Sequence, residues 1–97
     1  MTVRFTRQAN NQLGAILEYV RDRNPQSAAR LAAAIDRACE QIVAHPDLGR
    51  NQDVEGVRRR VVQSGRYLVY YAVSNEDRAI IILAISHPAR QRPYNDA

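Results

Sequence analysis

Apolar residues recur along the first half of the chain with two different periods, and each period predicts a different element. Val3 and Phe5 alternate with polar residues, which predicts a short N-terminal strand. Thr6 follows this strand and has the hydroxyl of a helix N-cap. From residue 7 to residue 23 the spacing changes to three or four positions, which is typical of one face of an amphipathic helix. The residues on this face are Ala9, Leu13, Ile16, Leu17 and Val20.

A second helix is predicted to begin at Asn24-Pro25, because Asn is a favoured N-cap and Pro fits the first helical position. Its apolar face continues until His45-Pro46. Only Arg23-Asn24 separate the two helices, so they should form an antiparallel hairpin. The apolar face of the second helix consists of Ala28, Leu31, Ala32, Ile35, Cys39, Ile42 and Val43.

Three strand-like segments follow a stretch without period at residues 47–56, which we predict to be a loop. The links at residues 63–65 and 75–77 are short enough for antiparallel hairpins. The last segment is a nearly unbroken apolar run, which predicts the most buried strand. The three segments span residues 58–62, 65–71 and 80–85.

Together these elements predict a single α+β domain over residues 1–97. Its sheet should have four strands: a three-stranded antiparallel meander and the first strand, which lies at the edge or beside the last strand. The helical hairpin should cover one face. Residues 91–97 are polar, which predicts a mobile tail. The predicted core consists of Val3, Phe5, Leu13, Ile16, Leu17, Val20, Leu31, Ile35, Cys39, Ile42, Leu68, Tyr70, Ile81, Leu83 and Ile85.

Composition agrees with one globular domain and excludes several classes of protein. Hydrophobic residues at 45% and charged residues at 25% argue against disorder. No run approaches the roughly 18 apolar residues of a membrane span, and the N-terminus lacks the apolar segment of a signal peptide. We therefore expect a cytoplasmic protein without membrane contact. A single cysteine, Cys39, rules out a disulfide within the chain, and its place on an apolar helix face predicts a buried, inert thiol.

The net charge is +4, and all fourteen cationic residues are Arg. A GC-rich coding sequence would give the same bias, but the absence of Lys still removes any ammonium group for acid–base or Schiff-base chemistry. The positive surplus indicates either a nucleic-acid surface or an acidic protein partner.

Signatures of metal, cofactor or covalent chemistry are missing from the sequence. There is no glycine-rich phosphate loop, no paired Cys or His at metal spacing and no nucleophile elbow, so we expect no metal and no cofactor. Ser86 and His87 are adjacent and would point to opposite faces of a strand, which excludes them as a nucleophile and its base.

What remains is a set of Arg residues interleaved with aromatic residues in the second half of the chain. Such a set can hold an RNA backbone and stack a base, or it can meet an acidic segment of a partner protein. Consecutive strand positions alternate faces, so Arg59 must differ in exposure from Arg58 and Arg60. The set consists of Arg58, Arg60, Arg66, Tyr67, Tyr70, His87, Arg90, Arg92 and Tyr94.

The order of these elements resembles the RelE/ParE superfamily, the toxins of bacterial type II toxin–antitoxin modules, over about residues 3–90. The matching motifs are Thr6-x-x-Ala9, Pro46-x-x-Gly49, Arg66-Tyr67-x-x-x-Tyr71 and Ile82-Leu83-x-Ile85-x-His87. The Pro-x-x-Gly loop and the final His are more similar to the ParE branch. This resemblance implies a toxin that inhibits DNA gyrase by protein contact. It also implies a ribbon-helix-helix, ParD-like antitoxin that neutralises the toxin in a hetero-oligomer.

For a ParE-like toxin no catalytic residue is favoured, and whether the protein is an enzyme stays open. The contacts to a partner are then expected from Arg58, Arg60, Arg66, Tyr67 and Arg90.

The resemblance leaves two alternatives. A RelE-like, ribosome-dependent mRNA endonuclease would use Arg66, Arg90 and Tyr94, while other nucleases of the superfamily use a Glu, an Arg and a His, for which Glu55, Arg66 and His87 are the candidates. Arg in place of the Lys of RelE-like nucleases preserves charge but weakens acid–base roles. The third possibility is a binding module without toxicity.

Overall fold

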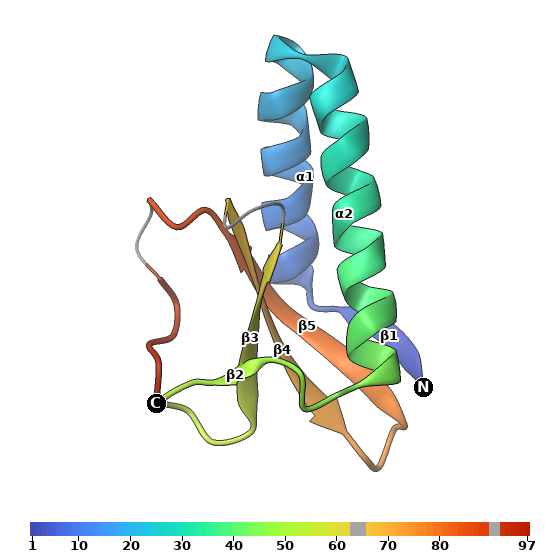
Figure 1. Cartoon of the computed structure of the whole chain (residues 1–97), viewed down its shortest axis with the longest axis vertical. Coiled ribbons are helices and arrows are strands. Elements are labelled where there is room, and N and C mark those ends of the chain that lie inside the picture. The colour runs from blue at the N-terminus through green and yellow to red at the C-terminus, as the bar shows by residue number, and fades with distance from the viewer. Residues whose placement is uncertain (63–65, 90–91) are drawn as a thin grey trace.

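A computed structural model describes residues 1–62, 66–89 and 92–97 of the chain. It consists of a helical hairpin packed on one face of a twisted sheet (Figure 1). The elements in chain order are β1 (Thr2–Phe5), α1 (Arg7–Arg23), α2 (Pro25–Ala44), β2 (Arg50–Asn51), β3 (Val57–Val62), β4 (Tyr67–Ser74) and β5 (Ala79–Ser86). The α+β class and the predicted order of strand, hairpin and meander are confirmed.

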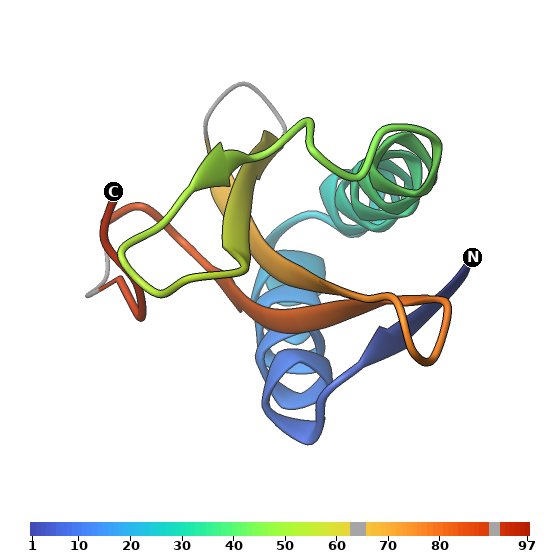
Figure 2. The same cartoon turned by 90° about the horizontal axis from the view of Figure 1, so that it is seen from below.

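In the described residues the sheet has five strands in the order β1-β5-β4-β3-β2, so the prediction of four strands is wrong by one. The additional strand β2 lies inside the predicted loop and pairs only Arg50 with Arg59 and Asn51 with Arg58. Two residues are too few to show a period in the sequence. At the other edge β1 lies beside β5 in parallel, whereas the remaining pairs are antiparallel (Figure 2).

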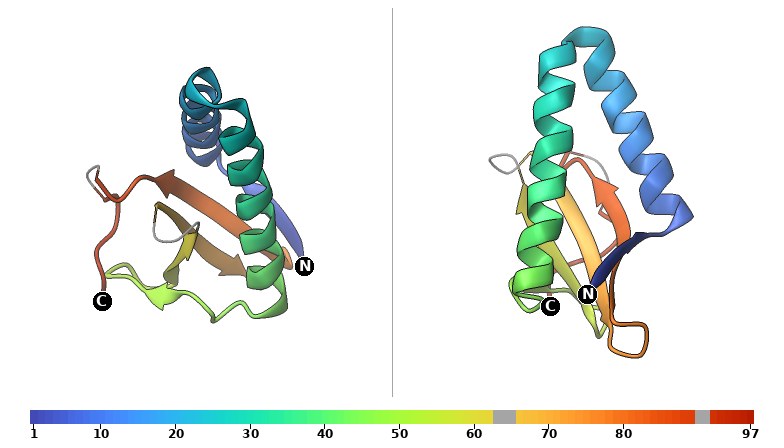
Figure 3. Two further views of the ribbon diagram at one scale, coloured as in Figure 1. Left: turned by 45° about the horizontal axis from the view of Figure 1, so that its top comes forward. Right: turned by 90° about the vertical axis from the view of Figure 1, so that its right-hand side faces the viewer.

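The hairpin turns at a single residue, Asn24. Its backbone N–H donates to Val20 O at the end of α1, and its side-chain oxygen accepts from the N–H groups of Gln26 and Ser27 at the start of α2. Asn24 therefore caps both helices, which is why the connection needs no further residues. The turn lies at the end of the hairpin that projects beyond the sheet (Figure 3).

The last strand contains an extra residue that decides which of its side chains face the helices. Tyr70 pairs with Ala84 and Tyr71 with Ile82, so Leu83 has no partner of its own and forms a β-bulge. The Thr6 hydroxyl donates to Leu83 O at 3.1 Å, which satisfies the carbonyl at the bulge. Ile82 and Ile85, three residues apart, consequently reach the same core.

Apolar side chains form a large cluster between the helices and the sheet and a smaller one on the opposite face. The predicted core is confirmed on the helices and at Ile85, whereas Leu68 and Tyr70 are buried in the smaller cluster. The prediction is wrong for Ile81, because its neighbours Ile80 and Ile82 face the helices, whereas Leu83 packs half-buried against the smaller cluster. The strand residues missing from the predicted core are Val57, Val62, Tyr67, Val69, Tyr71, Ala79, Ile80, Ile82 and Ala84.

Candidate functional site

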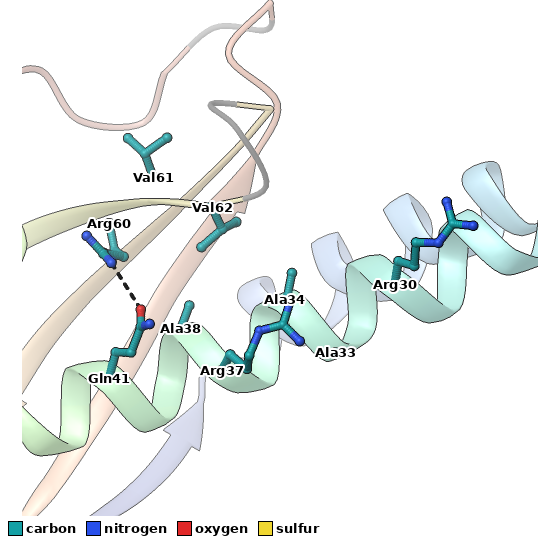
Figure 4. A pocket seen from close by; sticks show the side chains of 9 residues that line it. All are labelled: Arg30, Ala33, Ala34, Arg37, Ala38, Gln41, Arg60, Val61 and Val62. Carbon is teal, nitrogen blue, oxygen red and sulfur yellow. Dashed lines mark hydrogen bonds between the residues drawn. The ribbon is translucent and has the colours of Figure 1, made fainter.

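A groove of about 500 Å³ runs between the outer face of α2 and strand β3 (Figure 4). Its floor is lined by small side chains, because α2 places alanines at successive turns along this face. The alanines leave room for the side chains of a partner to approach the helix backbone. The described residues that line it are Arg30, Ala33, Ala34, Arg37, Ala38, Gln41, Arg60, Val61 and Val62.

Three arginines make this groove electropositive. Arg30 and Arg37 lie two helical turns apart on α2, and Arg60 faces them from β3. Arg60 is held in place because its Nη2 donates to Gln41 Oε1 at 3.0 Å. None of the residues that line the groove is acidic. The groove therefore favours an acidic segment, since its cations attract carboxylates and its alanines accept apolar side chains.

The strand that borders the groove is also open along its outer edge. Strand β2 pairs with Arg58 and Arg59 only, so in the described part of the chain Arg60 to Val62 have no strand beside them on that side. An edge of this kind can take an extended peptide through main-chain hydrogen bonds.

Arg58, which the sequence suggested as a partner contact, is used inside the domain. Its Nη1 donates to Asp47 O at 3.1 Å and to Gly49 O at 2.8 Å, so it fixes the loop that follows α2. The Tyr71 hydroxyl holds the same loop, donating to Pro46 O and accepting from the Gly49 N–H, both at 2.8 Å. Burial raises the pKa of Tyr71, and the Gly49 N–H and Arg58 oppose this shift.

Arg59 takes the opposite face of the sheet from Arg58 and Arg60, although all three are half-buried and so do not differ in exposure as predicted. Arg59 faces the side of the sheet opposite to the helices, and its side chain is 11% exposed and paired with Asp96. The side chains of Arg58 and Arg60 lie on the helix-facing side of the sheet. Their paired residues on β4, Tyr71 and Val69, lie on the same side.

Another group of candidate residues meets at the end of the sheet where β4 begins and β5 ends. Arg66 is exposed at the start of β4, and Tyr67 beside it is buried. The ring of Tyr67 meets the ring of His87 edge-on, with 5.5 Å between the ring centroids. Arg90 lies outside the described residues. Arg66, Tyr67 and Arg90, like Arg58 and Arg60, stay predicted as partner contacts.

Of the residues proposed for nuclease chemistry, Glu55, Arg66 and His87 do not form one site in the part of the chain that the structure describes. Glu55 is exposed in the turn before β3, whereas Arg66 and His87 lie at the other end of the sheet. The six residues of β3 separate the two ends by about 20 Å. Tyr94 packs on Tyr70, with ring centroids 5.3 Å apart, on the face away from the helices.

The described residues contain no group of three or more His, Cys, Asp or Glu side chains that could hold a metal ion. None of their helices is long and apolar enough to span a membrane.

The sequence did not reveal every residue of the groove. Arg30 and Arg37 are spaced by seven positions, like Ala34 and Gln41, so the helical period alone could have placed all four on one face of α2. The contact between Gln41 and Arg60 joins a helix to a strand 19 residues later and has no local signal.

Solved structures with a similar fold include toxins of toxin–antitoxin systems. A chain of the chromosomal ParDE system of P. aeruginosa superimposes with a TM-score of 0.74 at 26% identity, covering 90% of this chain and 95% of that chain. The isolated RelE toxin of E. coli superimposes with a TM-score of 0.66 at 12% identity, covering 94% of this chain and 87% of that one. At this low identity the likeness to RelE shows the fold alone.

The sequence identifies the family within this fold. A family profile described as "ParE toxin of type II toxin-antitoxin system, parDE" matches residues 3–92. A protein of Sinorhizobium fredii (strain NBRC 101917 / NGR234), named "Putative toxin Y4kP", is 30% identical over 91 residues, 94% of this chain and 92% of the relative. The chain belongs to the ParE toxin family and is the toxin of a ParDE-type toxin–antitoxin system. The predicted membership of the RelE/ParE superfamily, with the ParE branch preferred, is confirmed.

Proposed function

We propose that this toxin inhibits DNA gyrase by direct protein contact. We further propose that a ribbon-helix-helix antitoxin silences it through an acidic segment that binds the groove between α2 and β3. Gyrase acts in the cytoplasm, so the proposal places the toxin there, in a hetero-oligomer with its antitoxin until release.

The observation that carries this proposal is the combination of a basic groove with candidate acid–base residues that lie apart. Arg30, Arg37 and Arg60 surround a floor of alanines and offer charge and space to a protein segment. Glu55 lies at the opposite end of the sheet from Arg66 and His87, so these three side chains cannot act on one phosphodiester bond in this arrangement. Contact with a partner protein needs only the cations and the space that the groove provides.

Purified toxin and gyrase test the target directly. We expect the toxin to reduce supercoiling of relaxed plasmid and to stabilise gyrase-bound cleaved DNA, and we expect stoichiometric antitoxin to restore supercoiling. Expression in cells without antitoxin should induce the DNA-damage response while leaving mRNA intact. Cleavage of mRNA in the ribosomal A site, with normal gyrase activity, would instead support the nuclease alternative. Growth unaffected by expression would support the non-toxic binding module.

A further inference from the structure

The C-terminal residues 92–97 cover part of the sheet face that points away from the helices. The Asp96 carboxylate lies at their centre: its Oδ1 is 3.1 Å from Arg59 Nη1, and its Oδ2 is 3.5 Å from Arg50 Nε. Gln52 Nε2 donates to the same Oδ1 at 3.1 Å. One carboxylate of the chain is thus held by side chains from β2, β3 and the residue after β2.

Main-chain hydrogen bonds lay this tail along the outer side of β2. The Asp53 N–H donates to Asn95 O at 2.7 Å, and the Ala97 N–H donates to Asn51 O at 3.1 Å. Residues 95 to 97 therefore extend the edge of the sheet like an incomplete strand. Such a segment, tied by few contacts at the end of the chain, opens at much lower free energy than the core.

Buried polar groups with no partner lie on the same face of the sheet as Arg59, which pairs with this carboxylate. Arg59, Tyr70 and Ser86 come from β3, β4 and β5 and share one face, since Arg59 pairs with Tyr70, and Ser86 pairs with Leu68, a neighbour of Tyr70 in the smaller cluster. Tyr70 is fully buried, and Ser86 is 9% exposed. Within the described residues, Arg59 Nε, Tyr70 Oη and Ser86 Oγ have no hydrogen-bond partner of good geometry, and the same holds for the acceptor Gln52 Oε1 and for Arg60 Nε on the helix-facing side.

Three such atoms on one face call for a physical reason, because more than about 90% of buried polar groups in folded proteins are hydrogen-bonded. Burial raises the pKa of Tyr70, while Arg92, Arg59 and the Ser86 hydroxyl oppose this. All three groups can donate a hydrogen bond, so the ligand that would satisfy them is an acceptor with negative charge.

We propose that Arg59, Tyr70 and Ser86 form a carboxylate-binding site, that Asp96 occupies it in part as an internal ligand, and that an acidic side chain of a partner protein replaces Asp96 when the tail lifts. Asp96, the residue of this chain that occupies the site, is a carboxylate, and we therefore assign the ligand as a carboxylate and not a phosphate. The choice of a protein partner rests on the proposed action by protein contact. The site lies on the opposite face from the groove, so one toxin can engage two acidic segments.

Binding of short peptides to the purified full-length toxin tests this site. The probe is a capped tetraglutamate peptide, and the variants are Asp96→Asn and, as a matched change of charge on the remote hairpin, Asp22→Asn. We expect Asp96→Asn to bind the peptide at least tenfold more tightly than Asp22→Asn. Amide shifts in NMR spectra should map the peptide to Tyr70 and Ser86 and their neighbours.

A second variant separates binding from folding. Adding Tyr70→Phe to Asp96→Asn removes one unpartnered donor but keeps the buried ring, so the fold should survive while peptide affinity falls severalfold. Equal affinity of the Asp96→Asn and Asp22→Asn variants, or shifts confined to the groove, would overturn the proposal. Stronger binding of inorganic phosphate or of a short RNA than of the peptide would overturn the assignment to a carboxylate. None of these measurements involves gyrase, so their failure is distinguishable from failure of the proposed function.

Discussion

At the scale of single residues, the loop after α2 depends on one buried hydroxyl. The Tyr71 hydroxyl is both donor to Pro46 O and acceptor from the Gly49 N–H. Gly49 is required here because a Cβ at this position would lie 2.7 Å from that hydroxyl oxygen. The loop therefore sits directly on the sheet, and it brings Arg50 into β2.

Replacing Tyr71 with Phe should lower the free energy of unfolding by about 1–3 kcal/mol, because both backbone groups lose a buried partner. Unfolding in urea, followed by circular dichroism, measures the change. Tyr19→Phe is the matched control, since Tyr19 is exposed and its substitution should shift stability by less than about 0.5 kcal/mol. Equal stability of the two variants would show that the Tyr71 hydroxyl does not hold the loop.

Cys39 should be almost inert in the native protein. Burial, and then the charges of Asp36 and Glu40, raise the pKa of its thiol from 9.0 to about 11. At pH 8 the reactive thiolate then falls from about one molecule in ten to about one in a thousand. We expect alkylation at pH 8 to be about a hundredfold slower in the folded protein than in urea, and comparable rates would contradict the burial.

The same shift fixes the pH dependence of the contribution of Cys39 to stability. The folded state disfavours the thiolate, so this contribution is complete below pH 9 and is lost as the pH rises toward 11. Unfolding in urea at pH 8 and pH 10.5 should therefore show a smaller free energy at the higher pH, and Cys39→Ala should reduce the difference.

At the scale of elements, Thr6 links three of them. It ends β1, caps α1 by accepting from the Ala9 N–H at 3.1 Å, and donates to the carbonyl of Leu83 at the bulge in β5. Thr6→Val keeps the shape of the side chain but removes the hydroxyl, and it should cost about 1–2 kcal/mol of stability. Thr6→Ser keeps the hydroxyl and should cost clearly less. Thermal unfolding of the two variants distinguishes the cap from simple packing, because packing alone would make Thr6→Ser the more costly substitution.

Local sequence signals predict the helical hairpin more closely than they predict the sheet. The period of α1 and α2 and the caps at Thr6 and Asn24 give the hairpin almost to the residue, since these signals are local. The apolar run of β5 shows that the strand is buried but not which side chains face the helices. That choice depends on the bulge at Leu83, which is fixed by β1 and β4.

The candidate site was less predictable for the same reason. The positive charge is evident in the composition, but tertiary contacts decide the role of each arginine. Arg58, Arg59 and Arg60 are consecutive, yet one holds a loop, one pairs with the C-terminal tail and one faces the groove. Nothing within the strand separates these three roles beyond the alternation of its faces.

At the scale of the whole molecule, the groove predicts how the antitoxin associates. Arg37→Ala with Arg60→Ala should slow association severalfold, reduce its salt dependence and cost about 0.5–2 kcal/mol in affinity, because exposed cations mainly steer an acidic segment. Arg58 is left unchanged because it holds the loop. Binding kinetics at several salt concentrations measure these effects.

The control for this measurement is Arg4→Ala with Arg7→Ala, which makes the same change in net charge on β1 and α1, away from the groove. It should leave most of the salt dependence intact. If both double variants flatten the salt dependence equally, the antitoxin responds to the net charge of the toxin and not to the groove.

The parallel pairing of β1 with β5 also determines when the toxin can exist during its own synthesis. Thr6 and Leu83, which meet at the bulge, are 77 residues apart. At about 5–20 residues per second a ribosome needs roughly 4–15 s to make that interval, and contacts of such long range close late in folding. Until β5 emerges, β1 has no partner and the apolar face of the hairpin lacks the strand that brings Ile80, Ile82 and Ile85 to the core. A cell that makes this protein therefore has an interval in which the nascent chain is present but the toxin is not.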